Sequence, residues 1–305
     1  MRRRVAVVGT LGGGLFVARR HAEGQRRPHD CACDASDLTS AMASVHERGL
    51  AVVPHFMPPA ELRAIRETPA FRSMPTSSLV PSDETWRTSA LGRYHRIHFS
   101  DDDLDAFGAV EARLRPYVAR FFGFGVDLLA DGVARGSEGS QYVVRSELQL
   151  LNAAPASHSQ SWHSDHQARG LTLVVPLVEF TPANGATQLL PGSHAPSRAW
   201  RWLLGGAQVV AAPAGSLLVY DARTYHRGLG NDTDASRPAL VFRYDRADER
   251  PPPGVGLVGS LLHAAVAATL HLLTAAVATA RDQASGALGS GGVDSGCART
   301  RAAER

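Results

Sequence analysis

The sequence contains no lysine, so all 32 of its basic residues are arginine. Because glycine and proline are abundant as well, we interpret this absence as compositional bias rather than as a sign of function. The net charge of +3 is unevenly distributed: residues 1–30 contain seven arginines and two acids, which leaves the other 275 residues with a charge of −2. A nucleic-acid-binding domain carries its positive charge in the body of the chain. The sequence therefore argues against nucleic acid as a partner.

Cysteine is almost as scarce. Cys31, Cys33 and Cys297 are the three cysteines of the chain, and all lie near its ends. Three residues at these spacings form neither a disulfide framework nor a four-ligand zinc site. The fold is therefore expected to rest on its hydrophobic core.

Long hydrophobic runs are also few. Residues 1–35 place arginines around an apolar run that is shorter than the ~20 residues of a membrane span, so we expect a targeting segment or a disordered leader. Residues 251–280 have apolar side chains at helical spacing and are expected to form an apolar helix that packs on the domain, on a partner or on a membrane surface. A membrane span, which the length of the segment permits, stays open as an alternative. Residues 281–305 are expected to be a disordered tail.

The same end segments indicate where in the cell the protein is located and whether it associates with a membrane. The arginine-rich leader suggests an organelle or the endomembrane system, and the cytoplasm is expected otherwise. Membrane association is expected through residues 251–280 or the N-terminal segment. No feature of the sequence indicates an oligomeric state.

Between the ends, residues 36–250 are expected to form one folded domain. Helix signals come first: Asp37 precedes an apolar-periodic run that stops at Gly49, and the acidic cluster at 101–103 opens a run towards Phe122. From residue 141 the pattern changes to short β-type runs, namely Tyr142–Leu151, Leu171–Phe180, Ala186–Leu190, Ser216–Tyr220 and Ala239–Tyr244. Because no long helical pattern separates them, an antiparallel sandwich or jelly roll is predicted.

The β region contains a candidate metal site. In the stretch Trp162-His163-Ser164-Asp165-His166, side chains at i and i+2 would share one face if the stretch is a strand, so His163 and Asp165 would point at one spot. A third ligand, His226, would complete the two-histidine, one-carboxylate set that leaves one face of an iron ion open. Arg237 follows eleven residues later, and its planar guanidinium suits a carboxylate.

These residues, with the run Asn184-Gly185 to Pro191-Gly192-Ser193-His194, resemble the phytanoyl-CoA dioxygenase family. The members are Fe(II)- and 2-oxoglutarate-dependent oxygenases, and the resemblance extends over about residues 40–245. It implies a mainly β fold with flanking helices, a double-stranded β-helix of the jelly-roll, cupin-like type. Neither end of the chain is covered.

The resemblance also implies roles for single residues. His163, Asp165 and His226 would bind Fe(II), and Arg237 would bind the distal carboxylate of the co-substrate 2-oxoglutarate. Gln160 and Thr187 match positions that contact 2-oxoglutarate in some relatives. His194 belongs to a turn signature and is not expected to be a ligand.

The reaction implied by the resemblance uses O2 to hydroxylate an unactivated carbon of a small or lipid-like molecule, while 2-oxoglutarate is decarboxylated to succinate and CO2. The carboxylate of Asp165 argues against halogenation, which requires a small residue at that position. Three alternatives stay open: a protein or peptide hydroxylase, a catalytically silent jelly-roll binding module, and a zinc hydrolase, in which Arg237 would have no role. The identity of the substrate is not indicated.

Overall fold

The computed structural model describes residues 37–124, 142–195 and 206–246, together with four short strands at 9–11, 14–16, 129–130 and 133–135. The expected helix at 251–280 and tail at 281–305 lie outside these residues, as does nearly all of the leader at 1–35, so the predictions for them stay predictions. None of the described helices is long and apolar enough to cross a membrane.

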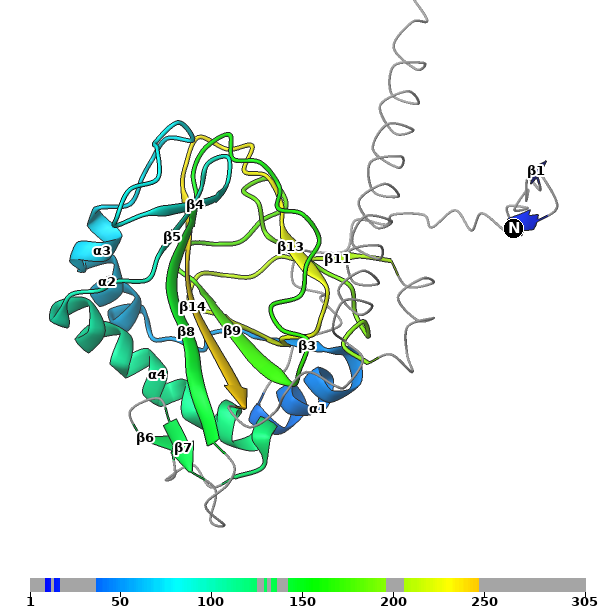
Figure 1. Cartoon of the computed structure of the whole chain (residues 1–305), viewed down its shortest axis with the longest axis horizontal. Helices are drawn as coiled ribbons and strands as arrows, with labels where there is room; N and C mark the ends of the chain where they lie inside the picture. The colour runs from blue at the N-terminus through cyan, green and yellow to red at the C-terminus, as the bar shows by residue number, and fades with distance from the viewer. Residues whose placement is uncertain are drawn as a thin grey trace, which may run out of the picture.

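Two antiparallel sheets form the body of the domain (Figure 1). The larger sheet has the strand order β3-β12-β9-β14-β8-β5-β4, and the smaller sheet has the order β11-β10-β13. Strands that are distant in sequence pair within each sheet, as in a jelly roll, so the predicted fold class is confirmed. The strands are β1 Gly9–Leu11, β2 Gly14–Phe16, β3 Leu50–Val53, β4 Arg87–Ala90, β5 Arg93–Arg96, β6 Leu129–Ala130, β7 Val133–Arg135, β8 Tyr142–Ala153, β9 Gly170–Pro176, β10 Thr187–Leu189, β11 Gln208–Val210, β12 Leu217–Asp221, β13 His226–Gly228 and β14 Arg237–Arg246.

The helices begin and end at residues that satisfy free backbone groups. The side chain of Asp37 accepts a hydrogen bond from the backbone N of Ser40 (2.8 Å) before helix α1, Leu38–Arg48, which ends at the left-handed Gly49 (φ 85°). Ser100 caps helix α4, Asp101–Phe122, in the same way. Such caps replace the hydrogen bonds that a helix end lacks. Helices α2, Pro59–Glu67, and α3, Pro69–Arg72, lie between them.

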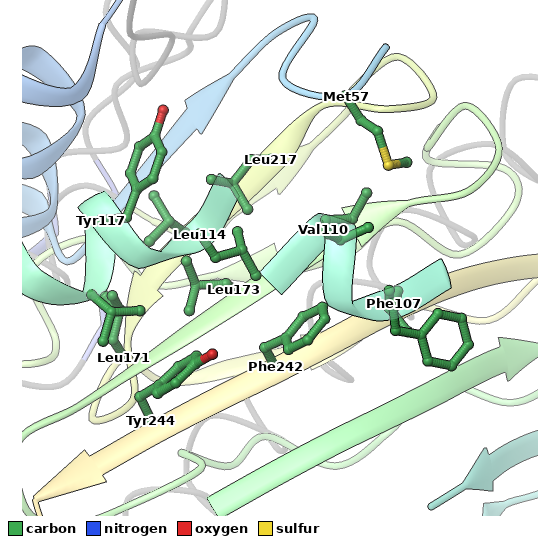
Figure 2. Packing of buried hydrophobic residues seen from close by; sticks show 14 of the residues in the cluster. Met57, Phe107, Val110, Leu114, Tyr117, Leu171, Leu173, Leu217, Phe242 and Tyr244 are labelled. Atoms are coloured by element: carbon green, nitrogen blue, oxygen red, sulfur yellow. The ribbon is translucent and has the colours of Figure 1, made fainter. Parts of the chain in front are cut away.

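Helix α4 packs on one face of the larger sheet, which we call the outer face (Figure 2). Its Val110 and Leu114 are fully buried in one apolar cluster with Leu173 of β9 and Phe242 of β14. Burial of apolar surface stabilises a fold by ~25 cal/mol per Å². This cluster is therefore a main source of stability, and it lies on the helix-covered side of the sheet.

The inner face of the larger sheet turns towards the smaller sheet. Val174 and Leu218 of the larger sheet pack in a second buried cluster with Leu189 and Val210 of the smaller one. Side chains of a strand alternate between the two faces of a sheet. On β8 and β14, the residues that precede and follow each outer-face residue in the sequence therefore point inward. The inner face of the sheet lines the cavity in which the candidate ligands lie.

Candidate functional site

His163, Asp165 and His226 come together at the edge between the two sheets. One potential ligand atom from each lies within 4.8 Å of the other two, and among the described residues this is the one such group of three. Nε2 of His226 lies 3.4 Å from Oδ1 of Asp165, and Nε2 of His163 lies 4.0 Å from the same oxygen. The predicted triad is therefore assembled by the fold.

The triad stretch is not a regular strand, which corrects the geometry expected from the sequence. Residues 154–169 form an irregular segment in which His163 makes a single bridge to His226. The backbone N of His163 donates to the O of His226 (3.0 Å), and the N of His226 donates back (2.8 Å). This bridge to the start of β13, rather than strand alternation, places the ligands together.

Hydrogen bonds to the backbone orient both imidazoles. Nδ1 of His163 lies 2.8 Å from the O of Ser161, and Nδ1 of His226 lies 3.0 Å from the O of Thr224. A carbonyl oxygen only accepts, so Nδ1 is the donor in each ring and Nε2 keeps its lone pair. Metal-binding histidines are held in this manner.

The carboxylate of Asp165 is oriented as well. Thr172 of β9 donates its hydroxyl to Oδ2 of Asp165 at 2.7 Å, which leaves Oδ1 to face the two imidazoles. Two Nε2 atoms and one carboxylate oxygen therefore converge. This donor set fits a ferrous ion with open coordination positions.

The charges in the triad favour a cation beside Asp165. Burial would raise the pKa of Asp165, but the charge and hydrogen bond of His226 and the bond from Thr172 hold it well below its usual value. Burial would lower the pKa of His226, and the carboxylate of Asp165 raises it instead. A divalent cation satisfies the same preference and would displace the proton from His226.

Tyr220 is a further residue of the site that the sequence did not indicate. It is the penultimate residue of β12, its ring is buried, and its hydroxyl lies 3.3 Å from Nε2 of His226. Burial raises its pKa strongly, and the nearby charge of Asp165 adds to the rise. Tyr220 is therefore a neutral hydrogen-bonding group next to the ligand atoms.

Two arginines line the same cavity as the triad. Arg237 is 1% exposed and stacks on the ring of Phe180 (4.4 Å), and Arg93 of β5 is 0% exposed. Both arginines lie opposite Ala153 in the strand pairing, one on each side of β8. Burial lowers the pKa of Arg237, and the charge of Arg93 lowers it further. Burial likewise lowers the pKa of Arg93 to about 10.

Neither arginine is paired with an acid in the part of the chain that the structure describes. Nη1 of Arg93 and Nε of Arg237 are buried without a hydrogen-bond partner among the described residues. Buried charges without a counter-charge are unfavourable. The pair therefore suits a carboxylate supplied by a ligand. Arg93 was not predicted as a site residue. Its neighbour Tyr94 is an aromatic residue on the same strand, so the two side chains point to opposite faces, and a core-facing Tyr94 could have indicated that Arg93 faces the site.

Gln160 and Thr187, both predicted to contact the co-substrate, line the same cavity. Oε1 of Gln160 accepts a hydrogen bond from the backbone N of Gly228 (3.0 Å), and Thr187 lies opposite Gly228 in the pairing of β10 with β13. Their proximity to the triad and to Arg237 agrees with the predicted positions. Their role in binding stays a prediction.

The cavity has a volume of about 110 Å³ and joins the triad to the arginine pair. Its remaining wall consists of His95, Glu147, Gln149, Leu151, Val174 and Val241. His158, His166 and His194 do not belong to the triad. The arrangement can thus hold one metal ion and, beside it, an acid that spans from the metal to the arginines.

Comparisons with known proteins agree with this arrangement. Residues 45–239 match the model of the phytanoyl-CoA dioxygenase (PhyH) family. Among solved structures, the chain is similar to AviO1 from Streptomyces viridochromogenes Tue57, at 22% identity and a TM-score of 0.53, over 72% of this chain and 100% of that chain.

Two further structures show the same fold. SnoN, a non-heme alpha ketoglutarate dependent epimerase from nogalamycin biosynthesis, is 19% identical with a TM-score of 0.51 over 71% of this chain and 87% of that chain. It was also crystallised with Fe3+, alpha ketoglutarate and nogalamycin RO. EctD from S. alaskensis, crystallised with 2-oxoglutarate and 5-hydroxyectoine, is 19% identical with a TM-score of 0.50 over 67% of this chain and 74% of that chain.

Proposed function

The chain belongs to the phytanoyl-CoA dioxygenase family, and from this premise we propose that it hydroxylates an unactivated carbon of a small molecule while converting 2-oxoglutarate to succinate and CO2. Membership makes it an Fe(II)- and 2-oxoglutarate-dependent oxygenase. The observation that carries the proposal is the single cavity that joins the His163, Asp165 and His226 triad to two buried arginines without acidic partners.

In this proposal the triad holds Fe(II) through Nε2 of His163, Oδ1 of Asp165 and Nε2 of His226. Bound Fe(II), with 2-oxoglutarate and O2, supplies the oxidative chemistry that transfers one oxygen atom to a C–H bond. Arg237, assisted by Arg93, binds the distal carboxylate of 2-oxoglutarate. Charge-assisted bonds from a planar guanidinium are strong and directional.

The other residues of the cavity control geometry and access. Thr172 fixes the carboxylate of Asp165, and Tyr220 presents its hydroxyl to the ligand atoms. The side chain of His163 is 37% exposed, whereas that of His226 is 6% exposed. The site is therefore open on the His163 side, and we infer that the substrate enters there. Gln160 and Thr187 border the co-substrate between the triad and the arginines.

Anaerobic addition of Fe(II) and 2-oxoglutarate tests this proposal, because the chelate has a weak visible metal-to-ligand charge-transfer band. We expect the band in the wild type, no band in Asp165→Ala, and a band that needs much more 2-oxoglutarate in Arg237→Met. Arg63→Met, a matched change of an exposed arginine on α2, should behave as the wild type.

The same experiment separates the alternatives. A folded, iron-loaded wild type without the band would contradict the oxygenase and favour a binding module. A zinc hydrolase would need neither 2-oxoglutarate nor the arginine pair, so an effect of Arg237→Met on 2-oxoglutarate binding argues against it. Once the band is established, succinate formation with small-molecule and peptide candidates distinguishes the two kinds of hydroxylase.

A further inference from the structure

A row of polar side chains forms one wall of the cavity beside the triad. We call His95, Gln149 and Glu147 the polar wall. Gln149 and Glu147 are alternate residues of β8, and Leu148 and Leu150 between and beyond them pack in the outer-face cluster. Alternation along a strand therefore turns the polar pair inward, where all three residues of the wall line the cavity.

Hydrogen bonds fix the direction of each group in the polar wall. Nδ1 of His95 lies 2.8 Å from Oε1 of Gln149, and Nε2 of Gln149 donates to Oε2 of Glu147. Because an amide oxygen only accepts, His95 donates through Nδ1. The row is thus pre-organised, with a carboxylate at its end.

Arg243 of β14 holds that carboxylate in place. It lies opposite Glu147 in the pairing of β8 with β14, and its Nη1 is 3.0 Å from Oε1 of Glu147. Its Nε also pairs with Oδ2 of Asp245 at 2.9 Å. Burial raises the pKa of Glu147, and the positive charge of Arg243 opposes that rise. Both contacts of Glu147, the ion pair with Arg243 and the hydrogen bond from Gln149, use its carboxylate oxygens as acceptors.

The Glu147 end of the polar wall lies next to the metal ligands, whereas His95 at its other end is two residues from Arg93 on β5. Nη1 of Arg243 is 3.4 Å from the backbone O of Asp165, so the two segments touch. Arg237 and Arg243 are six positions apart on β14, or about 20 Å along an extended strand. The cavity therefore has a basic end, which fits 2-oxoglutarate, and an acidic wall beside the reacting centre.

The polar wall still has hydrogen-bonding capacity. A carboxylate has about four acceptor positions, and the contacts of Glu147 with Gln149 and Arg243 use two of them. Gln149 donates one of its two N–H groups to Glu147. The side chain of Glu147 is 35% exposed, which leaves it accessible to a molecule in the cavity. An anion here would meet the charges of both Glu147 and Asp165.

We propose that Glu147 and Gln149 bind hydroxyl or amino groups of the substrate that is hydroxylated. That substrate is therefore a polar, hydrogen-bond-donating molecule rather than an acyl chain or an anion. This inference rests on the proposed function and narrows its substrate class. Leu151, Val174 and Val241 cover the remaining surface and fit the carbon skeleton that bears the reacting C–H bond.

Three probes distinguish the classes. Methyl β-glucoside supplies neutral hydroxyl groups, its 2-amino-2-deoxy analogue replaces one of them by an ammonium group, and hexanoyl-CoA supplies an acyl chain with anionic groups. Each is titrated anaerobically into the wild-type protein loaded with Fe(II) and saturating 2-oxoglutarate. Binding is followed by perturbation of the charge-transfer band and independently by calorimetry.

We expect both sugars to bind and hexanoyl-CoA not to bind. Glu147→Gln should weaken the ammonium probe by about tenfold or more, because hydrogen bonds to charged groups are strong, and the neutral probe by a few-fold. A larger loss for the ammonium probe identifies an amine as the preferred group. Glu179→Gln, a matched change of an exposed acid after β9, should leave both affinities unchanged.

Two results would overturn this inference: failure of both sugars to bind, whether or not hexanoyl-CoA binds, or sugar affinities that Glu147→Gln does not alter. Circular dichroism confirms that the variant is folded, and Glu147→Asp, which keeps the charge, should recover part of the affinity for the ammonium probe. If the wild type with Fe(II) and 2-oxoglutarate shows no charge-transfer band before any probe is added, the proposed function is contradicted instead. Calorimetry would still measure whether the probes bind to the polar wall.

Discussion

The buried arginines show how a single side chain can serve binding at the expense of stability. Arg237 is desolvated and contacts the ring of Phe180, yet no acid pairs with it in the described part of the chain. An unpaired buried cation opposes folding, whereas the same cation binds an incoming carboxylate strongly because little water competes.

Arg237→Met should therefore separate binding from stability. We expect the apparent dissociation constant for 2-oxoglutarate to rise by ~30-fold or more, the loss typical of one partner of a buried charge pair. The free energy of unfolding without ligand should stay unchanged or increase. Titration of the charge-transfer band and urea unfolding measure the two quantities. A variant that is strongly destabilised without ligand would contradict this account of Arg237.

Thr172 offers a second test at the scale of one atom. Its hydroxyl orients the carboxylate of Asp165, so Thr172→Val removes that hydrogen bond and keeps the shape of the side chain. Loss of such a supporting contact typically weakens metal binding by about 10–100-fold. We expect this loss in anaerobic Fe(II) titrations, with Thr88→Val on the exposed face of β4 as control. Equal Fe(II) affinities in both variants would show that Thr172 does not position Asp165.

At the scale of elements, structure that depends on local signals could be predicted from the sequence, and structure that depends on long-range contacts could not. Helices α1 and α4 could be predicted because their capping residues act on groups three positions away. The irregular segment that carries His163 could not, because its course depends on partners far along the chain. Gln160 pairs with Gly228, His163 with His226, and the N of His166 with the O of Ala222. The four main site residues were still predicted, since residue type and spacing do not depend on that course.

The N-terminus of α4 provides a test with a defined pH dependence. Asp103 is 0% exposed and accepts hydrogen bonds from the backbone N of Ala70 (2.8 Å) and of Ser100 (3.0 Å). Burial would raise its pKa, but these bonds, the Ser100 hydroxyl and the charge of Arg96 lower it below the ordinary value of an aspartate. The ionised carboxylate therefore ties α4 to α3.

We expect Asp103→Asn to destabilise the protein by about 1–3 kcal/mol at neutral pH, because the amide cannot accept all of these bonds. A depressed folded pKa contributes stability above the unfolded pKa, and that stability is lost as the pH falls through the folded pKa. The difference between wild type and variant should therefore shrink on acidification below about pH 4. Denaturant unfolding across this range measures it, with the exposed Asp102→Asn as control. A difference independent of pH would contradict the role of the ionised carboxylate.

At the scale of the whole molecule, the larger sheet separates stability from chemistry. Its outer face packs against α4 (Figure 1), and its inner face lines the cavity. The two functions therefore depend on different side chains of the same strands. On β14, for example, Phe242 lies in the apolar cluster while Val241 lines the cavity.

This separation predicts the effect of a change in the outer layer. Leu114 of α4 is 0% exposed, and Leu114→Ala removes buried methyl groups and leaves a cavity in the apolar cluster. We expect a loss of about 2–5 kcal/mol in the free energy of unfolding. At a temperature where the variant is fully folded, its affinity for 2-oxoglutarate should equal that of the wild type, because the larger sheet lies between Leu114 and the site. Urea unfolding and the charge-transfer titration measure the two quantities. Leu114→Ala should lower stability and leave binding unchanged, whereas Arg237→Met should weaken binding without lowering stability. If Leu114→Ala also weakened 2-oxoglutarate binding in the folded state, the helix layer would have to shape the inner face through the sheet, and the two layers could not be treated as independent.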